Sequence, residues 1–88
     1  MLNGDFESSL LAAIPKARLY ARALTKSEND ADDIVQESLL KSIERKEQFE
    51  TGTNIEAWLV TIIKNTFFEM KKYIFINKTK IIFINLYI

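Results

Sequence analysis

Apolar residues recur every three or four positions through three successive stretches of this 88-residue chain. The first stretch runs from Phe6 to Leu24, and the other two follow the polar segments around Ser27 and Gly52. This spacing places the apolar side chains on one face of an α-helix. Because the connecting segments are short, residues 1–72 are predicted to form an all-α domain, a small bundle of three or four helices.

Local signals set the expected limits of the first two helices. Pro15 lacks an N–H group and clashes with the preceding turn, so a break or kink is expected at Ile14, with a fresh helix that has Pro15 in its first turn. Residues 27–30 supply capping side chains. The second helix is therefore expected to run from about Ala31 to Lys46.

The third helix has a different start signal. Thr53 followed by Glu56 fits a capping box, in which each side chain satisfies a free N–H group of the other residue. The helix that follows is expected to end near Lys72. On this division, residues 1–72 form the folded domain and residues 73–88 a separate tail.

The tail, YIFINKTKIIFINLYI, is rich in Ile, Phe, Asn and Lys and contains no Ala, Gly, Asp, Glu or Arg. Its alternating apolar residues around NKTK fit a hairpin, although an isolated two-stranded hairpin is marginal in water. It is too short, and too interrupted by Lys78 and Lys80, to span a membrane. We expect an extension unrelated to the domain, with a lysine-punctuated partner-binding or membrane-surface segment as the alternative.

The composition argues against most enzyme classes. The chain has neither Cys nor His, which removes thiolate metal sites, disulfides and the commonest general base. The absence of Cys favours a reducing compartment, no signal peptide is visible, and a cytoplasmic setting is expected. No cofactor, metal or catalytic residue is predicted. The net charge is zero, yet acids dominate residues 28–50 while residues 16–26 and 64–72 are basic. The surface is therefore expected to be bipolar.

The most acidic stretch is DADDIVQESLLKS, residues 30–42. At 100° per residue, Ala31, Val35, Leu39 and Ile43 share a side that can face the core. The opposite side carries Asp33, Gln36, Glu37, Leu40, Glu44 and Glu47. These acids either cap the helix and complement its dipole, or surround Leu40 as a docking site for a basic partner. Asp30, Asp33 and Glu37 also lie about a turn apart, so a third hypothesis is that they share a divalent cation.

The third helix combines an apolar face with a basic, aromatic one. Its core face is expected to hold Leu59, Ile62, Ile63, Phe67 and Met70. The other side carries Thr61, Lys64, Asn65, Phe68, Lys71 and Lys72, with Trp58 at the edge. Lysines attract phosphates and aromatic rings stack on unpaired bases, so this face suits single-stranded nucleic acid. The alternative is that Trp58 and Phe68 belong to the core and that the lysines are simply solvated.

Three motifs, taken in order, give the chain a specific resemblance. AAIPKARLYARAL, DADDIVQESLLKS and QFETGTNIEAWLVTIIKNTFFEMKK together resemble the second conserved region of bacterial sigma factors, over residues 5–72. The extracytoplasmic-function class is the most similar, and GTN, AWL and KNTFF are similar to its alphaproteobacterial general-stress subgroup.

The resemblance implies a transcription-initiation role with no chemistry of its own. By position, Asp33, Gln36, Glu37 and Leu40 fall on the face that such factors dock on the coiled coil of the RNA polymerase β′ clamp. Gly52, Thr53 and Asn54 fall on the loop that captures a base flipped out of the promoter −10 element. Trp58, Lys64 and Asn65 match the path of the separated non-template strand. The basic segment that follows in the family is reduced here to Lys71 and Lys72, which lowers the DNA affinity expected.

The chain also departs from the family pattern. Members continue into a basic run, a linker and a helix-turn-helix region that reads the −35 element, whereas here the tail follows Lys72. The resemblance therefore implies a truncated factor with an intact polymerase-binding surface and doubtful promoter recognition of its own. The alternative is an interaction module or decoy that binds an anti-sigma factor without promoter activity. No membrane partner is expected.

Overall fold

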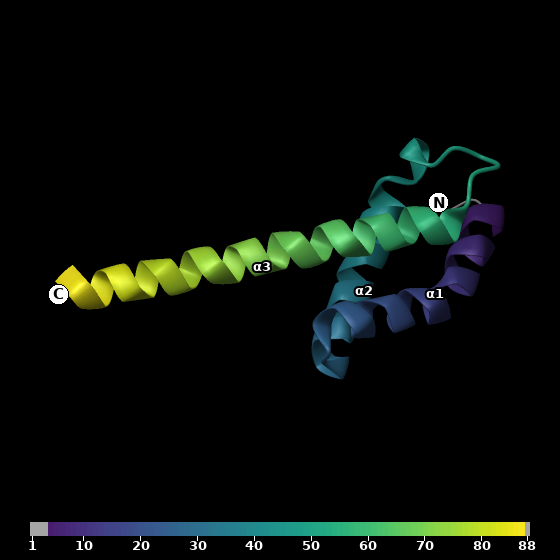
Figure 1. Cartoon of the computed structure of the whole chain (residues 1–88). Helices are drawn as coiled ribbons and strands as arrows, with labels where there is room; N and C mark the ends of the chain where they lie inside the picture. The colour runs from purple at the N-terminus through teal and green to yellow at the C-terminus, as the bar shows by residue number, and fades with distance from the viewer. Residues whose placement is uncertain (1–3, 88) are drawn as a thin grey trace.

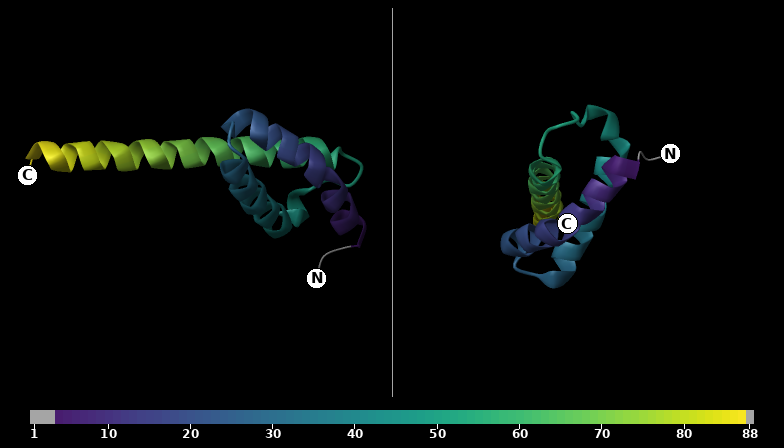
Figure 2. Two further views of the ribbon diagram at one scale, coloured as in Figure 1. Left: turned by 90° about the horizontal axis from the view of Figure 1, so that it is seen from below. Right: turned by 90° about the vertical axis from the view of Figure 1, so that its right-hand side faces the viewer.

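The computed structural model describes the backbone of residues 4–87 and the side chains of residues 4–72. Its elements are α1 (Gly4–Thr25), α2 (Glu28–Glu44), the short 3-10 helix η1 (Lys46–Gln48) and α3 (Ile55–Tyr87). In Figures 1 and 2, α1 and α2 pack around the first half of α3, whose second half extends beyond them. The predicted all-α bundle is confirmed, with three α-helices in the described range.

The core lies where the three helices meet, and the residues that α1 contributes to it are mostly small. Ala13, Ala17 and Ala21 are each almost completely buried. Their methyl groups let the backbones of neighbouring helices approach closely. Larger side chains from α2 and α3 fill the remaining space, namely Ile34, Val35, Leu59 and Ile63, with Leu10 and Ala31 completing the cluster.

A second seam, between α2 and α3, is polar. Ser38, Ser42 and Thr66 are buried there. The Ser42 hydroxyl donates to the carbonyl oxygen of Ser38 at 2.8 Å, and the Thr66 hydroxyl donates to that of Ile62 at 2.7 Å. The Ser42 and Thr66 hydroxyls are thus satisfied by their own helices, whereas the buried Ser38 hydroxyl has no hydrogen-bond partner within the described side chains. Small residues thus line the seam on both helices, and the Thr66 hydroxyl also accepts a hydrogen bond from Lys41 of α2 at 3.1 Å.

Of the two outcomes expected near Pro15, a break with a fresh helix is absent and a bend is present. α1 continues from Gly4 to Thr25 with Pro15 inside it, and Figure 1 shows a change of direction midway along the helix. Pro15 is exposed, so its ring and the carbonyl group that loses its N–H partner lie on the solvent side. Leu10, Ala13 and Ala17 anchor the helix in the core on both sides of the proline.

The second helix begins three residues earlier than predicted, at Glu28, and ends at Glu44. Ser27 is its N-cap, and the Ser27 hydroxyl accepts a hydrogen bond from the Asp30 N–H at 3.3 Å. One capping residue is therefore sufficient, and Glu28 and Asp30 lie in the first turn, where acids complement the helix dipole.

The predicted capping box on α3 was also wrong. The side-chain oxygen of Asn54 accepts hydrogen bonds from the N–H groups of Glu56 and Ala57, at 2.9 and 3.3 Å. The Thr53 hydroxyl instead donates to the carbonyl oxygen of Glu50 at 2.7 Å. Asn54 is thus the cap, and Thr53 belongs to the preceding turn.

The far end of α3 differs from the prediction too. The helix runs on through Lys72 to Tyr87, and residues 73–87 are helical where a hairpin was one expectation. A strand pair gains little in water without a sheet or core to pack on, whereas a helix satisfies its own backbone hydrogen bonds as it elongates. No described helix is long and apolar enough to cross a lipid bilayer.

Two residues assigned to the core face lie at the surface. Ile43 is 40% exposed and Met70 37% exposed, whereas Ser38 and Ser42 are buried in their place on α2. Ser38 and Ser42 continue the buried side of α2 and Thr66 that of α3, so the apolar positions beside them are left at the surface. The remaining assignments, including Ala31, Val35, Leu59, Ile62 and Ile63, were correct.

Candidate functional site

The outward side of α2 carries an acidic face, consisting of Asp33, Gln36, Glu37, Leu40 and Glu44. All five are exposed, and Leu40 keeps 58% of its surface in contact with solvent. Their spacing of three or four residues aligns them along one side of the helix. Neither Asp33 nor Glu37 pairs with a basic side chain in residues 4–72. The face is therefore a strip of unneutralised carboxylates around an apolar centre.

The loop between η1 and α3 has a fixed shape. Gly52 has a φ of +93°, a conformation that L-residues with a side chain rarely adopt. Both the N–H and the hydroxyl of Thr53 bond to the carbonyl oxygen of Glu50, at 3.1 and 2.7 Å. Asn54 then caps α3. The structure brings the three predicted loop residues together, but the Asn54 oxygen is occupied by the helix that it caps.

An aromatic cluster anchors this loop to the bundle. The rings of Phe49 and Trp58 have centroids 5.2 Å apart, and the ring of Phe6 lies 5.8 Å from Phe49 and 6.0 Å from Trp58. All three residues are partly buried. Their tilted and edge-on geometries are those that aromatic pairs favour. Trp58 therefore has a structural role beside any contact with nucleic acid, as the core alternative for this residue anticipated.

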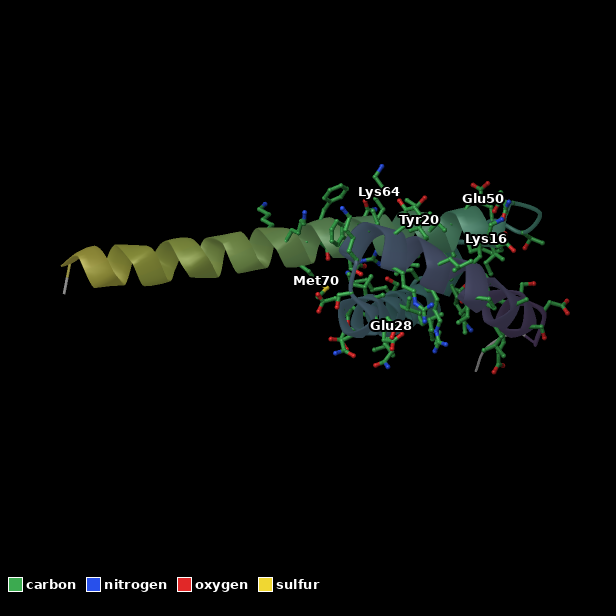
Figure 3. All side chains as sticks on the ribbon, turned by 60° about the horizontal axis from the view of Figure 1, so that its bottom comes forward. Lys16, Tyr20, Glu28, Glu50, Lys64 and Met70 are labelled. Atoms are coloured by element: carbon green, nitrogen blue, oxygen red, sulfur yellow. The ribbon has the colours of Figure 1, made fainter. Side chains whose placement is uncertain are left out.

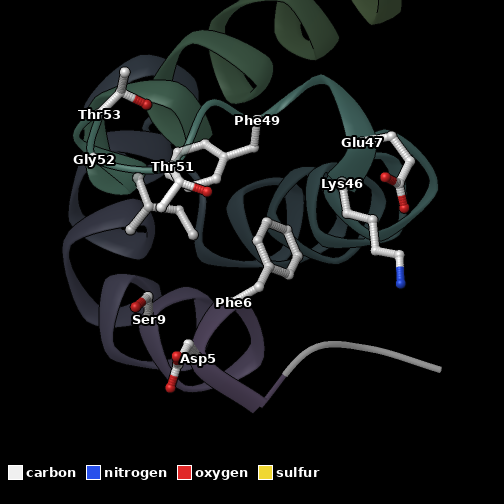
Figure 4. A pocket seen from close by; sticks show the side chains of 10 residues that line it. Asp5, Phe6, Ser9, Lys46, Glu47, Phe49, Thr51, Gly52 and Thr53 are labelled. Atoms are coloured by element: carbon white, nitrogen blue, oxygen red, sulfur yellow. The ribbon is translucent and has the colours of Figure 1, made fainter.

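A pocket of about 730 Å³ opens between this loop and the start of α1. Figure 4 shows Phe6 and Phe49 on its walls, with Thr51, Gly52 and Thr53 along the loop side. Asp5, Ser9, Lys46, Glu47 and Ile55 complete the lining. The pocket thus combines aromatic surfaces, hydroxyl groups and a lysine, which together can enclose a flat polar ring such as a nucleobase.

The basic face of α3 lies on the side of that helix opposite its core residues Leu59 and Ile63. Lys64, Asn65, Phe68, Lys71 and Lys72 are all exposed. Figure 3 shows Lys64 pointing away from α2, on the side opposite Met70. The ammonium group of Lys71 lies 4.9 Å from the centroid of the Phe67 ring, a cation–π contact. The acidic face of α2 and the basic face of α3 are therefore separate surfaces.

The hypothesis of a divalent cation shared by carboxylates of α2 is not supported by the geometry. Within the part of the chain whose side chains are described, no three carboxylates come together in a way that could hold a metal ion. Asp30, Asp33 and Glu37 instead lie exposed along α2.

The pocket includes residues that the sequence interpretation did not single out for function. Phe6, Ser9 and Asp5 come from the first turns of α1, about 45 residues before the loop they face. Only the packing of α1 against α3 brings them there. Phe49 carried a usable signal, because an aromatic residue inside a polar loop suggests an anchor.

Comparisons with known proteins agree on one family. Residues 10–64 match the family model of the Sigma2 domain of PhyR. Over 66 residues the chain is 39% identical to the ECF RNA polymerase sigma factor EcfG of Rhodopseudomonas palustris (strain TIE-1), a match that covers 75% of this chain and 36% of that protein.

A solved structure gives the same result. The fold matches the sigma factor RpoE of Bartonella quintana, crystallised in complex with the anti-sigma factor NepR, with a TM-score of 0.75 and 35% identity. The match covers 81% of this chain and 44% of RpoE. The chain therefore spans less than half the length of either relative.

Proposed function

The chain belongs to the extracytoplasmic-function sigma factors of bacteria, through their second conserved region, and on this premise we propose that it binds RNA polymerase core with the acidic face of α2. Members of this family act in transcription initiation. The exposure of Leu40 among unpaired acids carries the proposal. An apolar anchor ringed by charge is typical of a protein-binding surface, in which the anchor supplies affinity and the charges speed encounter.

A binding titration with the β′ clamp coiled coil tests this proposal. The full chain is titrated at low and physiological salt, next to the double variant Asp33→Lys, Glu37→Lys. Binding is expected to weaken with salt and to fall at least about tenfold in the variant. Leu40→Ala should weaken binding without changing the salt dependence, because it removes the anchor and no charge.

A matched control separates this surface from net charge. Glu7→Lys, Glu50→Lys changes the charge by the same amount at two exposed positions outside α2. It should bind the coiled coil almost as the natural chain does. Equal losses in both double variants would mean that only the total charge matters and would contradict the proposal.

We also propose that the pocket beside the Gly52 loop receives an unpaired base of the −10 element, while the basic face of α3 follows the non-template strand. The pocket is supported by its aromatic walls and loop hydroxyls at the start of α3. The strand path is supported by the exposed lysines along the side of α3. Stacking would offset the cost of unstacking the base, and phosphate contacts would add affinity independent of sequence.

Single-stranded −10 oligonucleotides with a fluorescent purine in place of one base test the pocket and the face separately. Phe49→Leu should reduce the fluorescence change on binding. Replacing Lys64, Lys71 and Lys72 with Gln should instead lower the slope of log affinity against log salt, by about 0.7 for each phosphate that is no longer neutralised. An unchanged slope would mean that the lysines do not contact the strand.

Binding of an anti-sigma factor is a second candidate function. The sigma factor of similar fold from Bartonella quintana was crystallised with NepR, and the matched family model is the Sigma2 domain of PhyR. Titration of this chain with NepR, followed by competition with the clamp coiled coil, distinguishes the candidates. Binding to NepR but not to the coiled coil would favour an interaction module over a polymerase-binding factor.

Finally, we propose that residues 1–72 are the folded unit and residues 73–88 an appendage. The core cluster and its flanking apolar residues lie between Phe6 and Phe67. A chain ending at Lys72 should melt at the same temperature as the full chain and remain soluble at higher concentration. A loss of folding on truncation would instead show that the second half of α3 completes the core.

A further inference from the structure

The outward side of α1 carries a second exposed strip of mixed character. Leu11 and Leu19 are 57% and 66% exposed, although both lie on a helix that contributes heavily to the core. Pro15, Arg18 and Arg22 are exposed between and beside them. The positions are spaced by three or four residues, so all five lie on one side of the helix. We call these five residues the basic strip.

The cations of this strip are only weakly engaged. Arg18 forms no ion pair with any side chain in residues 4–72. Arg22 lies 3.7 Å from Glu28, whose side chain is 79% exposed. Such an exposed and long pair contributes little. The strip is therefore two solvated leucines with positive charge beside them.

The basic strip and the acidic face of α2 are complementary in three respects. Each spans twelve residues, from Leu11 to Arg22 and from Asp33 to Glu44, or about 18 Å of helix. Each carries exposed apolar side chains, Leu11, Pro15 and Leu19 on the basic strip and Leu40 on the acidic face. Their charges are opposite, and the net charge of the whole chain is zero.

From this complementarity we infer that the chain associates with a second copy of itself, the basic strip of one molecule lying along the acidic face of the other. Leucines of one strip then contact Leu40 of the partner, and Arg18 and Arg22 meet Asp33 and Glu37. A pairing of unlike surfaces either closes into a dimer or continues into longer assemblies. Each contact is about three turns of helix, which is the size of a weak and reversible interface.

Self-association would bury the surface proposed above to bind polymerase, and this consequence rests on the proposed function. At high concentration or without polymerase, the acidic face would then be covered by a second copy of the chain. Polymerase and the second copy would compete for this face. A nucleic acid is a poorer occupant of the basic strip than a protein, because phosphates would neutralise the arginines but leave both leucines in water.

Sedimentation of the full chain over a concentration series, at low and high salt, tests the inference. The natural chain should gain mass with concentration, and less so at high salt. Arg18→Glu, Arg22→Glu should remain monomeric, because both of its surfaces are then acidic. Asp33→Lys, Glu37→Lys should remain monomeric for the opposite reason. Circular dichroism verifies that both variants keep the helical fold.

The mixture of the two variants is the decisive sample. The acidified α1 of one then matches the basic α2 of the other, and the two unmodified surfaces match as well, so equal amounts should associate at least about tenfold more tightly than either variant alone. Association that persists in each variant alone would overturn the inference. Contact through the apolar residues after Lys72 would give that result, because neither charge reversal affects those residues. A natural chain that is monomeric throughout, or a mixture without added mass, would also overturn the inference.

These outcomes are independent of the polymerase proposal. The Arg18→Glu, Arg22→Glu variant keeps its acidic face and should bind the clamp coiled coil at least as well as the natural chain. A failure of self-association with intact clamp binding rejects only the inference. A failure of clamp binding in a monomeric variant rejects only the proposed function.

Discussion

The ammonium group of Lys41 lies 2.8 Å from Oε2 of Glu69 and 3.1 Å from Oγ1 of Thr66, so that one lysine joins α2 to α3. Its side chain is only 15% exposed. Thr66 is buried and the Glu69 side chain is exposed. The ammonium group of Lys41 therefore contacts the buried polar seam on one side and is neutralised by a surface carboxylate on the other. The two bonds of Lys41 thus hold α2 and α3 in register with each other.

The pair of Lys41 and Glu69 makes stability depend on acid pH. The hydrogen bond from Lys41, and secondly its charge, hold the pKa of Glu69 below its ordinary value of 4.5. A lowered pKa in the folded state means that the stabilisation is complete above the ordinary value and is lost as the pH falls through the lowered one. Glu69→Gln should therefore lower the melting temperature near neutral pH and flatten its decline in acid. Thermal melts from neutral pH to about pH 3 check this, with Glu50→Gln expected to follow the natural chain.

The alanine row on α1 should not tolerate larger side chains. Ala17 is 1% exposed between α1 and its neighbours, so Ala17→Leu is expected to destabilise the fold by about 1–3 kcal/mol or more through overpacking. Ala12→Leu is the matched control, because Ala12 is exposed on the same helix. Its effect should remain within about 0.5 kcal/mol. Urea denaturation of both variants gives the comparison, and equal losses would mean that the alanine row is not closely packed.

The identity of the α3 cap has a direct test. Asn54→Ala removes the acceptor of two backbone N–H groups and should cost about 1 kcal/mol of unfolding free energy. Thr53→Ala removes one exposed hydrogen bond within a turn and should cost clearly less. The reverse order would support the capping box that the sequence suggests. Denaturant unfolding of the two variants is sufficient to decide.

The aromatic anchor of the loop can be followed through Trp58, the single tryptophan of the chain. Phe6→Leu removes a ring packed edge-on against it and should shift its emission to longer wavelength and make it easier to quench with acrylamide. Phe68→Leu, a change at an exposed position on the same helix, should leave the emission unchanged. A similar response in both variants would mean that Phe6 does not shield the indole.

Much of this architecture follows from local sequence patterns. Periodicity identified the three helices, and the opposition of Leu59 and Ile63 to Lys64 divided α3 correctly. The exposure of Leu40 in an acidic setting was also predictable, because every acid near it falls on the same side of α2. These properties depend on residues within one helix, which is the range over which sequence spacing determines direction.

The errors arose where the outcome depended on a neighbouring element or on a choice between nearby groups. Pro15 remains inside α1 because core contacts on both sides hold the helix together. Ile43 is exposed because the helices meet at serines that a hydropathy pattern does not recognise as core. Thr53 and Asn54 are both residue types that cap helices, and the turn around Gly52 selects between them. Phe6 reaches the pocket only through tertiary packing.

The alanine row and the serine–threonine seam also bear on the motions available to the domain. Alanine has no side-chain torsion between heavy atoms, and serine has only one, so helices that meet through Ala13, Ala17, Ser38 and Ser42 have few alternative packings to exchange. Such contacts resist sliding, because the small side chains at them offer few rearrangements that could absorb a shift. A partner that binds α2 would therefore meet three helices that respond as one rigid body. The loop between η1 and α3, around Gly52, would keep its orientation relative to α2 without a separate ordering step.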